Sequence, residues 1–443
     1  MKKIFAIQLA FVVLSFVGCS TEILQRKNFI SVGGKNFMLD ESPIFFAGTN
    51  FWYGAYLGAE QPIGNRERLI NELDELENLG IKNLRILAGS ETAYIKNTLP
   101  IPIQINPGEI NEDILSGLDF LLFEMSKRNM HAVLFLNNYW EWSGGFVVYN
   151  QWTNFGDIID PYVDEEGWGG FMNYSAKFYQ NTEGNKYFLD YIERIIKREN
   201  KFSNKYYYED PTIMAWELAN EPRPGADLNS LANQFYYYDW INRTAAFIKS
   251  IDPNHLVTTG SEGFMGSLQT DSIFIKAHKI ENIDYATFHL WPKNWGWYDA
   301  KRNNETFDST LIKAKNYFDK HMKLAREINK PIVLEEFGLS RDNEDCSPNS
   351  KTSVRDKYLT FIYKTIEDSI ENGAPIAGSN FWGWSGKGRT HRKDFIWRIG
   401  DDYLADPPQE PQGFNSVFDI DTSTINIIKK HSAKMNAFSQ SKN

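Results

Sequence analysis

One pattern recurs along the chain and constrains its fold more than any other feature. A short apolar or β-branched run is followed by a longer amphipathic run, and the pair then repeats. The short runs have the length of strands and occupy residues 44–52, 83–88, 131–138, 212–221, 256–262, 284–291, 331–338 and 377–384. Helical periodicity lies between them at residues 66–79, 113–128, 187–199, 231–251, 309–328 and 353–372, with a weaker segment at about 268–278. Eight strands that alternate with helices predict a single α/β domain, a (β/α)8 TIM barrel, rather than an open doubly wound sheet.

The length of 443 residues suits one such barrel with long loops on its rim. The nearest approach to a Gly-rich phosphate loop, at residues 383–388, fits neither of the nucleotide-binding fingerprints. We therefore expect the chemistry at the carboxyl ends of the strands, where barrel enzymes place it.

The N-terminus has the composition of an export signal. Lys2 and Lys3 precede an apolar stretch at residues 4–17 that is too short to span a membrane comfortably, and Gly18 stands directly before Cys19. A small residue before a cysteine resembles the bacterial lipobox, in which that cysteine becomes the lipidated first residue. We predict a lipoprotein signal peptide at 1–18, a polar leader at 19–28 and the barrel domain at 29–443. The lipid on Cys19 would hold the protein at the outer membrane or cell surface; a plain signal peptide would make it secreted or periplasmic.

Charge and aromatic content narrow the choice of partner. A formal net charge of −10 repels phosphate backbones, so nucleic acid is excluded as a partner. Aromatic residues make up 15% of the chain, which suits a cleft that stacks sugar rings, with an aromatic-rich core as the alternative. Two predicted rim loops carry several tryptophans, namely Trp140, Trp142, Trp152, Trp168, Trp295 and Trp297. A neutral polysaccharide is compatible with these features, and we expect a monomer.

Two of the predicted strands end in glutamate. The fourth ends in Asn220-Glu221-Pro222 and the seventh in Glu335-Glu336. Strands four and seven of a barrel lie across its central cavity, so two carboxyl groups there can face each other. Cleavage of a glycosidic bond needs such a pair, one carboxylic acid to protonate the leaving oxygen and one carboxylate to meet the oxocarbenium-like carbon. Helix-capping or salt-bridged rim residues are the alternative interpretation.

Three stretches resemble glycoside hydrolase family 5, and within it the endo-β-1,4-mannanase branch. They are residues 216–223 (WELANEPR), 334–338 (LEEFG) and 380–384 (NFWGW), and the resemblance extends over nearly the whole chain from Phe46. It implies a retaining mechanism in which Glu336 is the nucleophile and Glu221 the acid/base. Retaining carboxyl groups lie roughly 5–5.5 Å apart and inverting ones roughly 6.5–9.5 Å apart, so a structure tests this implication.

Glu335 is the obvious rival of Glu336 for the role of nucleophile. Adjacent side chains of a strand point to opposite faces, so only one of the two is expected to enter the cavity. The position within the family motif favours Glu336. Glu335 is then expected to lie against the helices or to pair with a basic residue.

The resemblance also assigns supporting roles on the first half of the barrel and on its last strand. Arg85, on the second strand, is expected to hydrogen-bond the nucleophile and keep its pKa low, while Glu221 stays protonated. Asn220 is expected to hold the 2-hydroxyl of the sugar next to the cleaved bond. Trp382, at the end of the eighth strand, would be the floor under that sugar.

Three further positions follow from the same resemblance. His289 matches the family's histidine beside the catalytic pair. Many relatives carry a tyrosine two residues later whose hydroxyl contacts the nucleophile, but this chain has Trp291, so either the indole N–H replaces that contact or the ring is mainly a stacking surface. Arg223 matches an arginine that, in the mannanase branch, contacts the sugar on the leaving-group side; a rim salt bridge is the alternative.

No metal or cofactor is expected. The seven histidines contain no pair at metal-ligand spacing, and Cys19 and Cys346 alone make no zinc site. No Gly-x-Ser-x-Gly elbow is present, which excludes a hydrolase with a serine nucleophile of that kind.

The leading interpretation is therefore a retaining endo-acting hydrolase of β-1,4-mannosidic linkages in mannan, galactomannan or glucomannan. An exo-β-mannosidase and a β-1,4-glucanase on the same scaffold are the nearest enzyme alternatives. A non-catalytic surface lipoprotein that binds glycans is the alternative of another class. Loops that block one end of the cleft would separate exo-acting from endo-acting cleavage.

Overall fold

The computed structural model describes residues 28–440, so the predicted signal peptide and Cys19 lie outside the described residues. Its centre is an eight-stranded parallel sheet in the order β10-β9-β8-β5-β4-β13-β12-β11. A parallel bridge from Thr258 to Tyr285 closes this sheet into a barrel. The predicted barrel and its eight strands are confirmed, with bounds β4 (Phe46–Asn50), β5 (Asn83–Leu87), β8 (His131–Phe135), β9 (Ile213–Glu217), β10 (Leu256–Thr258), β11 (Ala286–Leu290), β12 (Ile332–Phe337) and β13 (Ile376–Phe381).

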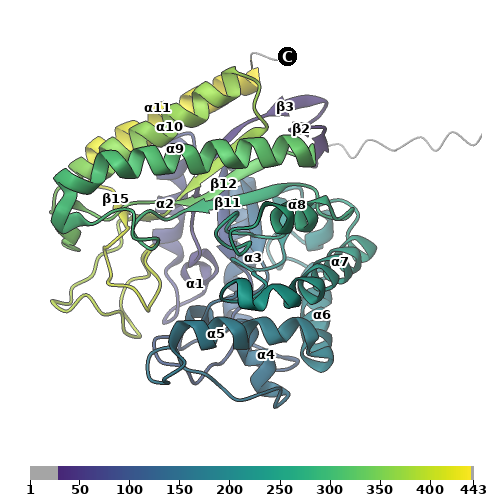
Figure 1. The fold of residues 1–443 in the computed structure, drawn as a ribbon. Coiled ribbons are helices and arrows are strands. Elements are labelled where there is room, and N and C mark those ends of the chain that lie inside the picture. The colour runs from purple at the N-terminus through teal and green to yellow at the C-terminus, as the bar shows by residue number, and fades with distance from the viewer. Residues whose placement is uncertain (1–27, 441–443) are drawn as a thin grey trace, which may run out of the picture.

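Helices surround the barrel, and each of the first seven strands is followed by one of the predicted helical segments (Figure 1). Their apolar faces pack on the strands in one continuous hydrophobic core. Even the weak segment between the fifth and sixth strands forms a helix. The bounds are α2 (Arg66–Asn78), α3 (Glu112–Ser126), α6 (Thr182–Ile196), α7 (Gln234–Ile251), α8 (Asp271–Lys279), α9 (Asn303–Ile328) and α10 (Ser353–Glu371).

A small antiparallel sheet closes the amino end of the barrel and was not predicted from the sequence. Its strands are β1 (Ser31–Gly33), β2 (Asn36–Leu39) and β3 (Ser42–Ile44). Phe37 of β2 is fully buried and packs with its ring centroid 6.0 Å from Phe46 and 5.1 Å from Tyr285. Because this end is filled with apolar side chains, the opposite, carboxyl end is the one left open for a site.

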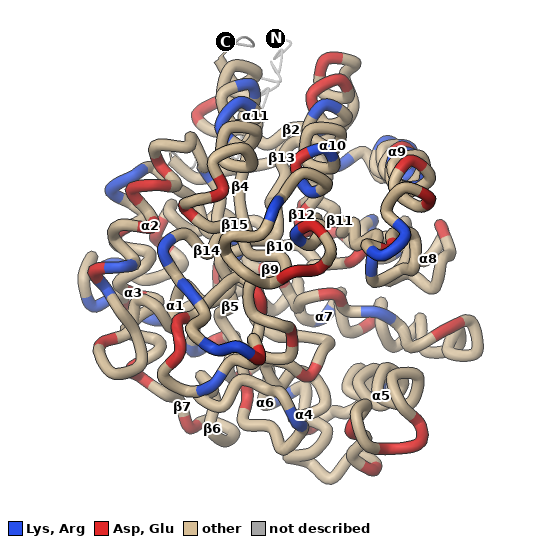
Figure 2. The backbone as a smooth tube through the Cα atoms, turned by 90° about the vertical axis from the view of Figure 1, so that its left-hand side faces the viewer, with Lys and Arg blue, Asp and Glu red and all other residues tan. Residues whose placement is uncertain are grey.

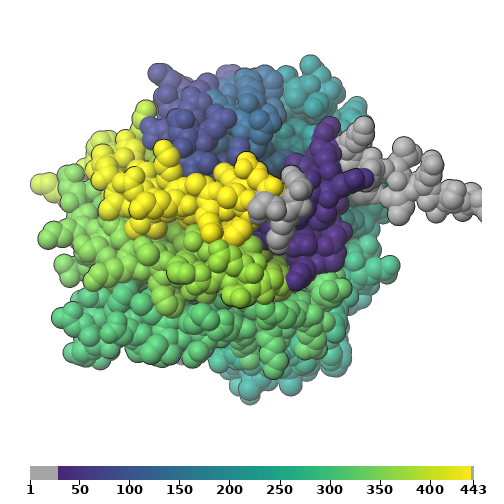
Figure 3. Space-filling model, turned by 90° about the horizontal axis from the view of Figure 1, so that it is seen from above, coloured from purple at the N-terminus to yellow at the C-terminus, as the bar shows by residue number. Residues whose placement is uncertain are grey.

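Several elements lie outside the predicted pattern. The long loop after the third strand contains α4 (Phe146–Trp152) and α5 (Gly167–Ala176), and a short α1 (Gly54–Gly58) follows the first strand. The C-terminal helix α11 (Thr422–Gln440) lies beside α10 and against β3 and β4, and Figure 3 shows it in yellow above the green segments, with the purple N-terminal strands beyond its right-hand end. Short strand pairs complete the loops, namely β6 (Gln104–Asn106) with β7 (Glu109–Ile110) and β14 (Trp384–Gly386) with β15 (Val417–Phe418).

Acidic and basic residues are interspersed over the surrounding helices (Figure 2). Within residues 28–440, no helix has both the length and the apolar character needed to cross a bilayer.

Candidate active site

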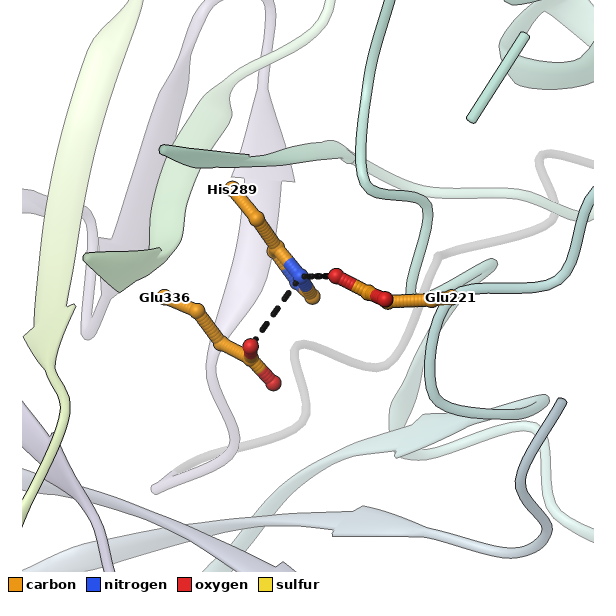
Figure 4. Close-up of side chains that lie close together, drawn as sticks. All are labelled: Glu221, His289 and Glu336. Carbon is orange, nitrogen blue, oxygen red and sulfur yellow. Dashed lines mark hydrogen bonds and ion pairs between the residues drawn. The ribbon is translucent and has the colours of Figure 1, made fainter. Parts of the chain in front are cut away.

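The two glutamates predicted on the fourth and seventh strands lie together at the carboxyl end of the barrel (Figure 4). Glu221 follows β9, and Glu336 is the second-last residue of β12. His289 of β11 lies between them, with Nδ1 2.6 Å from Glu221 Oε1 and 3.3 Å from Glu336 Oε2. All three residues are buried, and one oxygen of each glutamate and a ring nitrogen of His289 lie within 4.8 Å of one another.

Glu221 is fixed by both its backbone and its side chain. It has a φ of 53°, in the left-handed region that costs a non-glycine residue about 1–3 kcal/mol. Its N–H donates to the carbonyl oxygen of Gly260 at 2.8 Å. The indole N–H of Trp140 donates to Oε2 at 2.5 Å, and His289 contacts Oε1. The surrounding loops therefore hold this carboxyl group in one orientation.

Arg85 lies beneath the pair and is fully buried. Its Nη1 donates to Glu336 Oε1, as the resemblance implied. Its Nε and Nη2 also bind Glu217 in a bidentate pair at 2.9 and 2.5 Å, and Nη2 donates to Asn220 Oδ1 at 2.8 Å. Burial opposes the charge of Arg85, but the carboxylates around it, Glu217 first, raise its pKa well above its ordinary value. One buried cation thus orients the nucleophile candidate and Asn220 together.

Glu335 pairs with a basic residue, which is one of the two positions expected for it, but it does so on the barrel side and not against the helices. Glu335 Oε2 lies 3.7 Å from Arg85 Nε and 3.9 Å from His289 Nε2, directly below Glu336. The cause is an irregularity in the register of β12. Phe288 pairs with Leu334 and His289 with Glu336, so Glu335 is an extra residue that breaks the alternation of the side chains. Glu336 still lines the pocket, whereas Glu335 is buried beside Arg85.

Burial raises the pKa of both Glu221 and Glu336 above the ordinary value of a glutamate. At Glu336, His289 and Arg85 oppose this rise but do not reverse it, so the expectation of a low pKa there is corrected. Burial lowers the pKa of His289 to about 4, which leaves the ring neutral at pH 7. Two adjacent carboxyl groups whose charged forms are both disfavoured titrate as one system and can retain a proton between them.

A pocket of about 600 Å³ opens above the two glutamates. Trp382 forms part of its wall next to Trp291, with ring centroids 5.8 Å apart at an angle of 72°. The indole N–H of Trp382 is buried and has no hydrogen-bond partner within residues 28–440. Further lining comes from the loops after the third, sixth and eighth strands, by Trp140, Glu141, Trp142, Tyr162, Trp168, Met172, Asn294, Trp295, Pro407, Gln409 and Glu410. The lining thus combines several aromatic rings with carboxyl, amide and guanidinium groups, which suits a ligand that has both apolar faces and hydroxyls.

Arg223 forms the rim salt bridge that was considered for it and also lines the pocket. Its Nη2 forms an ion pair with Glu262, and its guanidinium lies 4.8 Å from the ring centroid of Trp140. The same Nη2 is 3.9 Å from Glu221 Oε2, and Arg223 lines the pocket. Glu262 also accepts a hydrogen bond of 3.0 Å from Trp295. The arginine is therefore a salt-bridged residue that is held at the pocket wall beside Glu221.

Glu221, His289 and Glu336 are also close enough to share a cation. Their atoms already have other partners, since Glu221 accepts from Trp140, and Glu336 accepts from Arg85 and Trp291. A charged arginine and two indole donors suit a pair that transfers protons and carries one negative charge.

The comparisons with known proteins agree with this geometry. The sequence model of the family described as "GH family 5 beta-mannosidase-like" matches residues 27–440. The chain belongs to glycoside hydrolase family 5.

This glycoside hydrolase is 34% identical to the glycoside hydrolase family 5 mannosidase from Rhizomucor miehei. The TM-score is 0.85, and the match covers 94% of this chain and 99% of the mannosidase. The endo-1,4-β-mannanase from the same organism has the same fold at a TM-score of 0.65 and 24% identity, with 92% and 99% covered. Among curated proteins, the putative mannan endo-1,4-β-mannosidase 4 of Arabidopsis thaliana is 28% identical, with 97% of each chain covered.

Sequence reasoning missed three residues that contact the predicted site residues: Trp140 binds Glu221, Glu217 binds Arg85, and Glu262 binds Arg223. Glu217 and Glu262 each stand near the end of a predicted strand, as Glu221 does, and this position was a signal that could have singled them out. Trp140 was noted only as one tryptophan of a loop. Its contact with Glu221 joins two loops that are 81 positions apart in the sequence, so no local pattern reveals it.

The indole N–H of Trp291 donates to Glu336 Oε2 at 2.9 Å, and its ring lines the pocket. We predict that Trp291→Phe, which keeps a ring but removes the donor, lowers kcat/KM by about ten-fold or more, because a hydrogen bond to a charged group contributes about 1.5–3 kcal/mol. Loss of the donor also raises the pKa of Glu336, so the acid limb of the pH profile moves to higher pH. If the acid limb of the pH profile does not shift, Trp291 does not stabilise the ionised form of Glu336. Trp152→Phe is the control, because Trp152 does not line this pocket.

Arg85→Gln is predicted to lower the free energy of unfolding by about 3–5 kcal/mol, because it leaves buried carboxylates without their cation. Urea denaturation measures the change. Arg243→Gln is the matched control, since Arg243 pairs with Asp239 on the surface at 2.7 Å and should change stability by at most about 1 kcal/mol. Equal unfolding midpoints for the two variants would show that Arg85 does not neutralise the cluster.

Proposed function

We propose that the protein hydrolyses β-1,4-mannosidic linkages of mannan-type chains with retention of anomeric configuration. The observation that carries the retaining mechanism is the separation of Glu221 and Glu336, one oxygen of each lying within 4.8 Å of the other. This short separation is nearer to the roughly 5–5.5 Å of retaining enzymes than to the roughly 6.5–9.5 Å of inverting enzymes, and it supports retention.

In the first step, Glu336 attacks the anomeric carbon of the sugar beside Trp382 and forms a glycosyl ester. The bond from that carbon to the glycosidic oxygen breaks, and Glu221 gives its proton to the leaving oxygen. In the second step, the Glu221 carboxylate takes a proton from water, and the resulting hydroxide attacks the anomeric carbon and releases Glu336. Arg85 and Trp291 hold the two oxygens of Glu336 throughout.

The choice of mannose is supported by the family and its relatives. The matching family description is β-mannosidase-like, and a variant of the Rhizomucor miehei mannosidase has been solved with mannosyl-fructose. The curated relatives are named mannan endo-1,4-β-mannosidases. Arg223 next to Glu221 is in the place expected for contact with the sugar on the leaving-group side.

Exo-acting cleavage is a second candidate, and one observation favours it over the endo-acting cleavage of the leading interpretation. The loops after the third and eighth strands meet around Trp52, which follows the first strand. The ring of Trp52 lies 5.6 Å from that of Trp142 and 6.2 Å from that of Tyr403, and its N–H donates to the carbonyl oxygen of Ala405 at 2.9 Å. Trp142 also lines the pocket, so these packed loops support the pocket wall on that side, and a closed side suits recognition of a chain terminus.

Hydrolysis of locust bean gum and of carboxymethylcellulose by the wild type and by Glu336→Ala tests the proposal. We expect reducing sugar from the galactomannan only, and none from the variant. Preference for carboxymethylcellulose would favour the glucanase alternative, and no release from either would favour a glycan-binding protein. The products formed from mannohexaose distinguish exo-acting from endo-acting cleavage. Exo-acting cleavage releases only mannose at early times, whereas endo-acting cleavage gives a mixture of oligosaccharides.

We also propose that the protein is exported and anchored by lipid at Cys19, as the N-terminal sequence predicts. Incorporation of labelled palmitate into the wild type and its loss in Cys19→Ser would support the anchor. Cleaved, unlabelled wild-type protein would favour the plain signal peptide.

A further inference from the structure

A second pocket, here named the outer pocket, lies beside the catalytic one and has a volume of about 280 Å³. Met172 and Arg223 line the catalytic pocket, and the residues that follow them in sequence, Asn173 and Pro224, line the outer pocket. The two cavities are therefore neighbours across two strips of backbone. The other residues that line the outer pocket are Ala176, Lys177, Gln180, Asn229, Ser230, Ala232, Asn233 and Tyr236.

The segment that lines one side of the outer pocket, residues 228–236, carries exposed apolar side chains. Leu228 and Leu231 of the 3-10 helix η4 (Leu228–Asn233) are 63% and 40% exposed. Phe235 and Tyr236 at the start of α7 are 67% and 49% exposed. Four large apolar residues within nine positions form a patch of the kind that marks a binding surface.

Hydrogen bonds join the wall of the outer pocket to the loop that carries the acid/base. Asn233 Nδ2 donates to the carbonyl oxygen of Pro224 at 2.6 Å, and Gln180 Nε2 donates to Asn233 Oδ1 at 2.9 Å. Tyr179 donates to the carbonyl oxygen of Arg223 at 2.9 Å. The position of the pocket is thus fixed relative to Glu221.

The chemistry of the lining suits a neutral, hydroxyl-rich ligand. Asn173 Oδ1 accepts from Ser230 Oγ at 2.7 Å, but Asn173 Nδ2 and Gln180 Oε1 make no hydrogen bond within residues 28–440. These exposed amide groups stand beside the ring of Tyr236, and Lys177 is the one charged residue of the lining. An aromatic face next to spare donors and acceptors is what a pyranose ring, with its apolar C–H face and its hydroxyls, requires.

We propose that the outer pocket is a distal subsite for the leaving-group side of a β-mannan chain. The inference rests on the proposed function, because Glu221 as acid/base marks the side on which the leaving sugar lies. A chain that passes from the catalytic pocket over the backbone at Arg223 and Pro224 would meet Asn173 and then the ring of Tyr236. Long chains would gain affinity there that a disaccharide, held in the catalytic pocket alone, cannot gain.

Tyr236→Ala tests the subsite through chain-length dependence. We expect the ratio of kcat/KM for mannohexaose to kcat/KM for mannobiose to fall about five-fold, in line with the size of aromatic contacts in general. Tyr206→Ala is the control, because Tyr206 is 40% exposed and precedes β9 at the amino end of the barrel. The control should keep the wild-type ratio. An unchanged ratio in Tyr236→Ala, or equal losses on both substrates, would overturn the subsite.

A binding measurement separates failure of the subsite from failure of the proposed function. Glu336→Ala with and without Tyr236→Ala is run through native gels that contain linear mannan, where only binding retards the protein. Weaker retardation of the double variant supports the subsite without any hydrolysis, and equal retardation overturns it. Analytical sedimentation of the wild type and of Phe235→Ala tests whether a second copy of the chain occupies the apolar patch instead. If the wild type is a dimer and Phe235→Ala is a monomer, the patch is a dimer interface and the subsite is overturned.

Discussion

Replacement of Glu336 with alanine is expected to lower kcat for an aryl β-mannoside by roughly 10⁴-fold or more, because it removes the group that forms the covalent intermediate. The side chain is buried at the base of the pocket, and its two oxygens are held by Arg85 and Trp291. Glu335, its neighbour in the sequence, lies beside Arg85 and does not line the pocket.

Added azide distinguishes a lost nucleophile from a damaged site. In Glu336→Ala, azide can enter the space of the missing carboxylate and attack the substrate directly, which gives the α-mannosyl azide. Recovery of activity with that product is expected. Rescue that gives the β-azide would contradict the assignment, because it would require an intact nucleophile elsewhere.

Replacement of Glu221 with alanine is expected to lower kcat/KM for mannooligosaccharides by about 10²–10⁴-fold, the usual contribution of a positioned acid. The first step of 2,4-dinitrophenyl β-mannoside cleavage should fall much less, since that leaving group departs without a proton. Burial raises the pKa of Glu221, so the wild type should lose activity on its alkaline limb when this group ionises. The variant should lose that limb. Equal losses on both substrates, with the limb retained, would contradict the role of Glu221.

The barrel could be predicted because each of its strands is a short apolar run between amphipathic helices, and that periodicity is local. The plug at the amino end was missed because β1 to β3 are only three or four residues long. The turns between them do carry turn-forming residues in the sequence, namely Gly33-Gly34 and Asp40, and Gly34 and Asp40 have positive φ in the structure. Helix α11 follows no barrel strand directly, and it packs instead on α10 and β4, so the repeating pattern gave no reason to place it.

The meeting of Glu221 and Glu336 could be predicted because both stand at or just beyond the carboxyl end of a strand, and parallel strands end at one rim. The position of Glu335 could not, because alternation of side chains fails where the register of β12 shifts. Trp291 shows a different limit. The sequence left open whether the indole N–H of Trp291 binds the nucleophile or its ring forms a stacking surface. In the structure the N–H donates to Glu336 and the ring also forms part of the pocket wall.

Covalent labelling tests the central claim most directly. In a 2-deoxy-2-fluoro-β-mannosyl fluoride, the 2-fluoro group slows both formation and hydrolysis of the glycosyl-enzyme. The fluoride leaving group makes formation faster than hydrolysis, so a retaining β-mannosidase accumulates the glycosyl-enzyme. We predict one sugar per chain, found by mass spectrometry on the peptide that contains Glu336 and attached to that residue. An active enzyme that takes up no label, or that carries the sugar on Glu335 or any other residue, would contradict the account.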